Sequence, residues 1–412
     1  MPPERAPSSR RLLTLLRVLL ALAILVWVGT NLPWRDELTY RAEPDAAEVE
    51  ADGRIEGDWK TERVSFVPDD RSKIGEGWPA EAREAVARGE PVVVERRAED
   101  GKAVGFDWHP GMPRAFRDMD LELLLVAEAL FLLSTLTIVT RWWRLLALAG
   151  CPTSWWNALR LTFLGLFFNN VLPGATGGDV VKGVVVAREN PGRGAEALVT
   201  VLVDRVFGMV ALAVLALVVI LVAPQLRGGA KEAGASFDAL RQPLIWGLVA
   251  CAAGAALYSS KTFRRRAGLS ALVTRLPIGD KLRSLDRAAM VYLKQPRAVA
   301  VAFLFSFVNH GLVTIGVIML GLALGVPFSE VSLTEWFVLV PVANLVSAVP
   351  LAPGGWGLGE LAFAGLFKMI DASGAMGVAV SVTFRLSQLA IGLLGGLAML
   401  LPSSRRELRE KN

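Results

Sequence analysis

The sequence predicts an all-α polytopic membrane protein with about six full transmembrane helices, two re-entrant broken-helix hairpins in inverted repeats, and a small β-rich extracytoplasmic insert. Three observations support this fold class. Hydrophobic residues make up 53% of the 412 residues. Apolar runs close to the length of a membrane span recur along the chain. A short motif rich in glycine and proline interrupts the apolar sequence twice.

Six apolar runs approach the length of about 20 residues that crosses a hydrocarbon core. They are residues 12–32, 121–140, 197–223, 243–259, 298–322 and 377–401. Two further stretches, 158–172 and 336–352, are too short or too broken to cross. The first run has a basic start and is followed by no small-residue cleavage site, so residues 1–34 are expected to be a cytoplasmic tail and a retained signal-anchor helix.

Charge is distributed unevenly along the chain. Residues 36–117 carry 20 acidic and 13 basic side chains, whereas 261–297 carry 10 basic and 2 acidic ones. Cytoplasmic flanks of membrane helices are rich in Lys and Arg. The flanking cations are Arg141, Arg144, Lys182, Arg188, Arg193, Arg405 and Arg406. We therefore expect a multi-pass protein of the cytoplasmic (inner) membrane with both termini in the cytoplasm, a basic cytoplasmic segment at 261–297 and a cytoplasmic tail at 404–412.

Residues 35–118 are expected to form a small extracytoplasmic α+β domain. Residues 63–67 alternate in the manner of a strand, and 91–95 are expected to pair with 102–106 through the turn Glu99-Asp-Gly101. Residues 79–88 are predicted to be helical. Trp59, Trp78 and Trp108 could bind a glycan or a partner, but the core of such a small domain is the favoured place for them.

The pattern P-x-A-x-G-G occurs in Pro173-Gly-Ala-Thr-Gly-Gly178 and again in Pro350-Leu-Ala-Pro-Gly-Gly355. A lone arginine follows each copy inside an apolar run, Arg205 after the first and Arg385 after the second. We therefore predict two membrane repeats, 119–260 with a re-entrant loop at 155–190 and 298–403 with a re-entrant loop at 333–372. The loops enter from opposite faces, which is the arrangement of an inverted repeat.

Both arginines are expected near the middle of the bilayer, where a charge needs a buried partner. Asp179 and Glu360 are the candidate partners, because each follows a Gly-Gly pair, whereas neighbouring side chains such as Asp204 and Arg205 diverge on a helix. Backbone N–H groups at the glycine turns could bind an anion. The alternative is that the ion pairs only fix helix packing and that the glycines only permit close approach.

Three stretches resemble the lysylphosphatidylglycerol synthase transmembrane region family, also called flippase-like domain proteins. They are Phe167-Phe-Asn-Asn-Val-Leu-Pro-Gly-Ala-Thr-Gly-Gly-Asp-Val-Val-Lys182, Val203-Asp-Arg-Val-Phe-Gly208 and Val349-Pro-Leu-Ala-Pro-Gly-Gly-Trp-Gly-Leu-Gly-Glu360. The resemblance covers about 121–402 and implies a helical module that moves aminoacylated phospholipids or polyprenyl-linked sugars across the bilayer. Because only Ser403–Asn412 follow, where the family's bifunctional synthases carry a soluble transferase, lysyl-lipid synthesis is not expected.

The function favoured by the sequence is therefore a lipid translocase without enzymatic activity. The expected substrate-binding residues are Asn170, Pro173, Gly177, Gly178, Asp179, Lys182, Asp204, Arg205, Pro350, Gly354, Gly355, Glu360 and Arg385. Expected partners are membrane lipids with an anionic or glycan-linked headgroup and an enzyme or glycosyltransferase that makes them; no nucleic acid, cofactor or metal is expected. Two alternatives remain: a scaffold that presents the outer domain in envelope assembly, and an intramembrane transferase using Asp179, Asp204 or Glu360 as a base.

Overall fold

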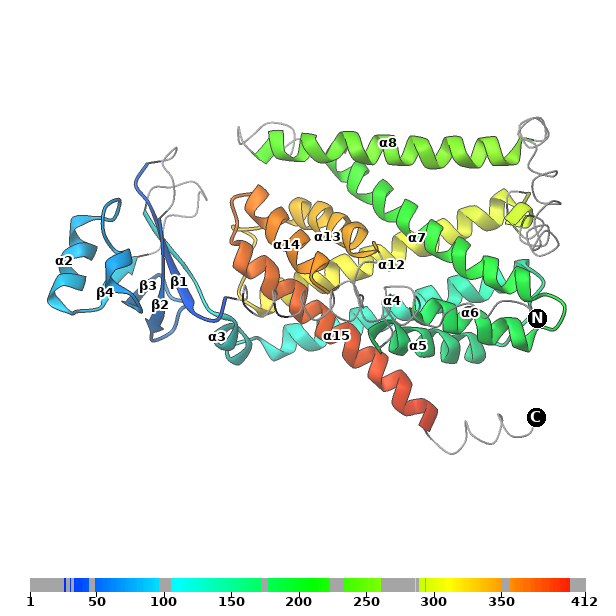
Figure 1. The fold of residues 1–412 in the computed structure, drawn as a ribbon, viewed down its shortest axis with the longest axis horizontal. Coiled ribbons are helices and arrows are strands. Elements are labelled where there is room, and N and C mark those ends of the chain that lie inside the picture. The colour runs from blue at the N-terminus through cyan, green and yellow to red at the C-terminus, as the bar shows by residue number, and fades with distance from the viewer. Residues whose placement is uncertain are drawn as a thin grey trace, which may run out of the picture.

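The computed structural model consists of a helical region and a smaller α+β region at one end of it (Figure 1). It describes residues 33–43, 49–95, 105–171, 177–222, 233–260, 294–349 and 356–400, together with Val26, Thr30, Asp286 and 289–292. Within these residues, five helices are long and apolar enough to cross a membrane. The chain is a multi-pass membrane protein.

The long helices are α4 (Leu121–Leu148), α7 (Gly194–Val222), α8 (Ala233–Ser259), α12 (Pro296–Ala323) and α15 (Gly374–Leu400). They correspond to five of the six predicted spans. The other, 12–32, lies outside the described residues apart from Val26 and Thr30. Local sequence sets where a helix begins: the Asp120 carboxylate caps α4 by accepting hydrogen bonds from the N–H groups of Glu122 and Leu123.

The two short apolar stretches are the first arms of helical hairpins. In the first hairpin, α5 (Trp155–Val171) is followed by α6 (Gly177–Glu189). Asn169 contacts Gly178 at one end of the pair, and Glu189 contacts Asn157 and Arg160 at the other, so the arms are antiparallel.

The second hairpin has the same design, with α13 (Leu333–Ser347) followed by α14 (Leu358–Met369). The rings of Trp336 and Phe367 lie 5.4 Å apart, and Gly359 lies beside Ser347, so these arms are also antiparallel. Both helical interruptions therefore lie at the two P-x-A-x-G-G motifs.

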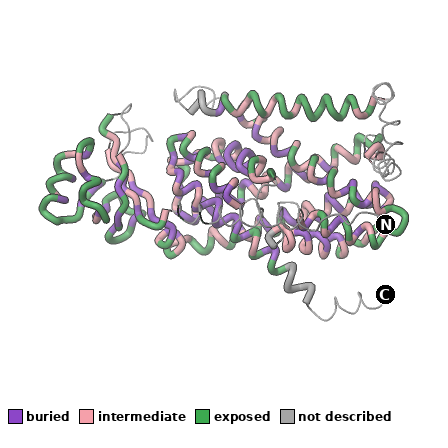
Figure 2. Tube along the Cα trace, in the orientation of Figure 1, coloured by how far each residue is buried: buried purple, intermediate pink, exposed green. Residues whose placement is uncertain are grey.

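The long helix that follows each hairpin packs against the other hairpin. Helices α4 and α12 pack against each other, α7 packs on α13, and α15 packs on α5 (Figure 1). The first arm of each hairpin is thus covered by the long helix that follows the other hairpin. By contrast, α8 contacts α7, and none of the residues in its most apolar stretch is fully buried (Figure 2). A surface of this kind suits lipid tails.

The α+β region contains a five-stranded antiparallel sheet in the order β4-β3-β2-β1-β5. Its strands are β1 (Asp36–Arg41), β2 (Val49–Glu56), β3 (Arg63–Pro68), β4 (Val92–Glu95) and β5 (Gly105–His109). A 3₁₀ turn (Arg71–Lys73) and α2 (Ala80–Arg88) lie between β3 and β4, and α3 (Met112–Arg117) follows β5.

The predicted pairing of 91–95 with 102–106 is wrong. Strand β4 pairs with β3, and β5 pairs with β1 at the far edge of the sheet. The proposed turn at Glu99-Asp-Gly101 lies outside the described residues. Alternation identifies a strand but not its partner. Strands β1 and β2 were missed; in β2 every exposed position carries a charge.

The three tryptophans are buried in the core of this region, as predicted. Trp59 also docks it onto the helical region. Its indole N–H donates to Asp118 at 3.2 Å, and its ring lies against Gly325, where an added Cβ would be 2.2 Å from a ring carbon. Gly325 also has a φ of +88°, so this contact has both a steric and a backbone requirement for glycine.

Candidate functional site

Both arginines singled out by the repeated motif line one cavity. It has a volume of about 220 Å³ and lies between the first arms of the two hairpins, α14 and the long helices α7 and α15. The lining residues are Leu166, Asn169, Arg205, Asn344, Ser347, Ala348, Phe363, Ser381, Phe384, Arg385 and Gln388. Residues far apart in sequence thus form a single mostly polar site.

On the first side of the cavity, Arg205 of α7 is held by Asp179 of α6. The distance from Arg205 Nε to Asp179 Oδ2 is 2.6 Å. Asp179 lies in the first turn of α6, where the helix dipole favours a negative charge. The predicted pairing of Asp179 with Arg205 is confirmed.

Lys182 lies behind this ion pair, not in the cavity lining. Its Nζ is 3.7 Å from Asp179 Oδ1 and 4.2 Å from the centre of the Trp142 ring. Only 5% of its side chain is exposed. Lys182 is therefore a buried cation stabilised by a carboxylate and an aromatic face, and not a charge in a cytoplasmic flank.

On the second side, Arg385 of α15 is held by Glu360 of α14. Arg385 Nε donates to Glu360 Oε1 at 2.5 Å, and the same oxygen accepts from Ser381 at 3.3 Å. An added Cβ at Gly359 would lie 1.7 Å from the Arg385 guanidinium, so this glycine makes room for the arginine. The predicted pairing of Glu360 with Arg385 is confirmed.

The two sides therefore share one arrangement. A carboxylate in the first turn of a hairpin's second arm binds the Nε edge of an arginine from the following long helix. Counting Lys182, the two pairs contain three cations and two carboxylates, which leaves one excess positive charge. An arginine in a poorly solvated site is a strong ligand for phosphate or carboxylate oxygens.

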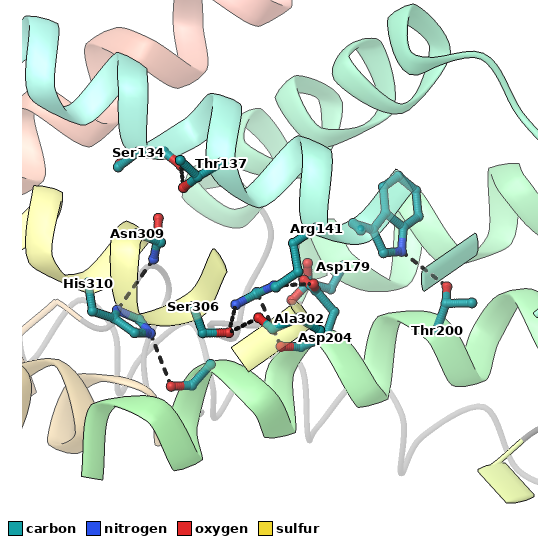
Figure 3. Close-up of polar contacts among 12 residues, drawn as sticks. Ser134, Thr137, Arg141, Asp179, Thr200, Asp204, Ala302, Ser306, Asn309 and His310 are labelled. Carbon is teal, nitrogen blue, oxygen red and sulfur yellow. Dashed lines mark hydrogen bonds and ion pairs between the residues drawn. The ribbon is translucent and has the colours of Figure 1, made fainter. Parts of the chain in front are cut away.

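Asp204 does not line this cavity. It pairs with Arg141 of α4 (Figure 3). Arg141 Nε is 2.8 Å from Asp204 Oδ1, and Arg141 Nη1 is 2.6 Å from Ser306 Oγ of α12. Arg141 is buried, whereas Arg144, Arg188 and Arg193 are exposed.

The glycine motifs contribute close packing at the described positions. An added Cβ at Gly178 would lie 1.7 Å from the carbonyl oxygen of Gly165, and the Gly178 N–H donates to Asn169. Gly177 begins α6. Pro173, Pro350, Gly354, Gly355 and the side chain of Asn170 lie outside the described residues.

Several cavity residues were missed by the sequence analysis. Ser381 and Gln388 share the face of α15 that carries Arg385, and Asn344 and Ser347 lie one turn apart on α13. A signal was present, since polar side chains on one face of an otherwise apolar helix commonly line a pathway. Among the described residues, no three His, Cys, Asp or Glu side chains are grouped to hold a metal ion.

Comparison with known proteins places these features in one family. The family model for the lysylphosphatidylglycerol synthase TM region matches residues 105–396. A UPF0104 membrane protein of Pyrococcus horikoshii is 26% identical over 313 residues, which cover 71% of this chain and 92% of that protein. No solved structure matches the chain. The chain therefore belongs to the lysylphosphatidylglycerol synthase TM region family.

Proposed function

We propose that the protein is a flippase-like translocase that moves a phospholipid, an aminoacylated lipid or a polyprenyl-linked glycan between the leaflets of the cytoplasmic membrane. The observation that carries this proposal is the meeting of Arg205 and Arg385 in one cavity. Each arginine follows a different copy of the repeated motif, so the cavity draws on both halves of the chain. Family membership supports a membrane-embedded role of this kind.

The charge of the site favours a headgroup with one negative charge. One excess positive charge remains after Asp179 and Glu360 are counted against the three cations. A phosphodiester, which carries a single charge, balances it. The side-chain amide groups of Asn169, Asn344 and Gln388 then suit the neutral polar part of a headgroup, because they can both donate and accept hydrogen bonds.

Movement between leaflets would follow from inverted repeats. In this proposal the hairpins are re-entrant, the repeat units are related by a pseudo-twofold axis in the membrane plane, and rocking of the halves exposes the cavity to each leaflet in turn. The reciprocal packing of α7 on α13 and of α15 on α5 supports this symmetry. Both termini would face the cytoplasm, and residues 35–118 would lie on the opposite side.

The test follows leaflet exchange of fluorescent lipids in vesicles that contain the purified protein. Arg205→Ala and Arg385→Ala should each lower the exchange rate of phosphodiester lipids at least tenfold. Arg160→Ala is the matched control, because Arg160 pairs with Glu189 at the other end of the first hairpin and does not line the cavity. The proposal is refuted if both arginine variants are folded and exchange lipids at the wild-type rate.

The alternatives make different predictions. A scaffold would tolerate both arginine substitutions but not loss of the docked outer domain, which Trp59 joins to the helical region. A transferase would need Asp179, Asp204 or Glu360 as a base; each is bonded to an arginine, and none lines the cavity. No observation favours the transferase.

A further inference from the structure

Two contacts between α4 and α12 occupy corresponding positions in the two halves of the helical region, and they differ in chemistry. We call them the polar place, where Arg141 meets Ser306, and the apolar place, where Phe131 meets Gly316. A shift of 175 residues relates Phe131 to Ser306 and Arg141 to Gly316, and a shift of 180 relates both Asp204 to Phe384 and Arg205 to Arg385. The observed contacts follow the same correspondence: Arg141 contacts Ser306, and their counterparts Gly316 and Phe131 contact each other. The pairs are what a twofold relation between α4 and α12 requires.

One of these places is polar and the other is apolar. At the polar place, Arg141 binds the Asp204 carboxylate at 2.8 Å, the Asp204 carbonyl at 3.2 Å and Ser306 at 2.6 Å, joining three helices. At the apolar place, the rings of Phe131 and Phe384 lie 5.1 Å apart, and Phe131 fills the space left by Gly316. Twofold packing alone would be satisfied by aromatic contacts in both places.

His310 of α12 extends the polar place. Its Nε2 lies 3.0 Å from the carbonyl oxygen of Gly208, and Nδ1 lies 3.3 Å from the amide nitrogen of Asn309 (Figure 3). This arrangement suits a neutral imidazole with its proton on Nε2. An added Cβ at Gly208 would be 3.8 Å from both His310 Nε2 and the Arg141 guanidinium, so the histidine and the arginine both lie beside this glycine.

Asn309 can serve a second protonation state of His310. Its Oδ1 is buried and has no hydrogen-bond partner within the described part of the chain. A protonated imidazole has two N–H donors. Rotation of the Asn309 amide would turn Oδ1 toward Nδ1, so the same side chain would then accept the second donor. Asn309 Oδ1 would therefore accept a hydrogen bond once His310 is protonated.

We propose that His310 is a proton-binding site that couples lipid movement to a proton gradient, with Asp204 as its counter-charge. His310 would take a proton from one side of the membrane and release it to the other. A protonated His310 competes with Arg141 for Asp204, which loosens the contact between α4, α7 and α12. The apolar place would remain a pivot that is insensitive to pH.

This coupling can reach the cavity through α7. Asp204 belongs to the polar place, and the next residue, Arg205, lines the cavity. A displacement of α7 caused by loss of the Arg141–Asp204 contact therefore moves Arg205 as well. A shared rigid helix with two arrangements is a physical basis for coupling between sites.

The other charged groups on the helices packed around α12 have separate places. Helix α4 contributes Arg141, with Glu122 in its first turn, Glu128 more than three turns before Arg141, and Arg144 against the Phe305 ring. Helix α7 contributes Asp204 and Arg205, with Glu196 in its first turn, and Arg385 of α15 lines the cavity. Glu335 of α13 caps that helix at Ser332. Arg141 thus lies beside His310, and Asp204 is bound to Arg141.

The inference rests on the proposed function, and its test separates the two. Vesicles hold the purified protein and a fluorescent phosphatidylglycerol, under a gradient of one pH unit with the membrane voltage clamped to zero. For one proton per lipid, the steady-state ratio of reporter between leaflets shifts up to tenfold, because one pH unit is a tenfold difference in proton activity. His310→Gln should keep exchange at equal pH and give a ratio near one under the gradient.

Phe131→Leu is the matched control at the apolar place and should keep the shift, while Asn309→Ala should reduce it and provides a second test if His310→Gln does not fold. If the wild-type protein exchanges no lipid between leaflets, the proposed function is overturned. Wild-type exchange that ignores the gradient would overturn proton coupling alone. A folded His310→Gln protein that keeps the full shift would also overturn it.

Discussion

Removal of the Glu360 carboxylate should destabilise the helical region more than removal of any exposed acid. Glu360 accepts hydrogen bonds from Arg385, Ser381 and the N–H of Gly357, and it is 1% exposed. Glu360→Ala takes this charge away from Arg385, which is 8% exposed. Breaking a buried ion pair from one side costs about 3–5 kcal/mol, because the remaining charge stays desolvated.

Thermal unfolding of the purified protein in detergent, followed by tryptophan fluorescence, measures this cost. On the scale of soluble domains each kcal/mol corresponds to a few degrees, so the midpoint should fall on the order of 10 °C. Glu189→Ala is the control: Glu189 pairs with Arg160, and both side chains are partly exposed at 30% and 27%. Such a pair contributes about 0–1 kcal/mol, so its midpoint should change by no more than a few degrees.

A double variant tests the physical reason. Glu360→Leu combined with Arg385→Met replaces the buried pair with apolar side chains of similar size, which often restores stability. The double variant should therefore unfold at a higher temperature than Glu360→Ala. The reasoning is refuted if Glu360→Ala lowers the unfolding midpoint no more than Glu189→Ala does. It is also refuted if the double variant unfolds at a lower temperature than Glu360→Ala or Arg385→Met alone.

Three further predictions follow from single contacts. Gly178→Ala should cost about 1–3 kcal/mol, seen as a lower unfolding midpoint, because its Cβ would meet the Gly165 carbonyl; Gly254→Ala, with nothing within 4 Å, should be neutral. Trp59→Ala should cost about 3–5 kcal/mol and speed proteolysis between the two regions; unchanged cleavage would contradict its docking role. Burial raises the pKa of Glu37, aided by Glu50 and Asp52 and opposed by His109. The folded state therefore binds the Glu37 proton more tightly than the unfolded state, so stability is lost as pH rises through the folded pKa; Glu37→Gln should slow hydrogen exchange of β1 at pH 7 and have no effect well below pH 4.5.

The ion pairs of the cavity could be predicted because their signal is local. Asp179 and Glu360 follow glycine pairs, and lone arginines in apolar helices need a partner, so spacing alone suggested the two contacts. Contacts with a partner distant in sequence could not be predicted in this way. Arg141 was placed in a cytoplasmic flank because Asp204 and Ser306, which bury it, lie on helices remote in sequence. The sequence around a Lys or Arg near a helix end does not show whether its long side chain points to solvent or to the interior.

The sheet illustrates the same limit. Alternation located β3, since the period of a strand is independent of its neighbours, and the predicted strand at 91–95 corresponds to β4. Pairing depends on chain topology, and β5 crosses to the far edge to join β1. Asn344 and Gln388 could be recognised as polar residues in apolar helices, but nothing in their local sequence shows that they face one cavity.

The interlocked packing of the helices has a consequence for how the protein is made. Helix α5 ends at Val171, whereas α15, which packs on it, begins at Gly374. At about 5–20 residues per second, a ribosome needs roughly 10–40 s to synthesise the intervening chain. Throughout that time the first hairpin lies in the membrane without its covering helix. Newly made chains therefore present an unfinished surface to the insertion machinery until the last helix arrives.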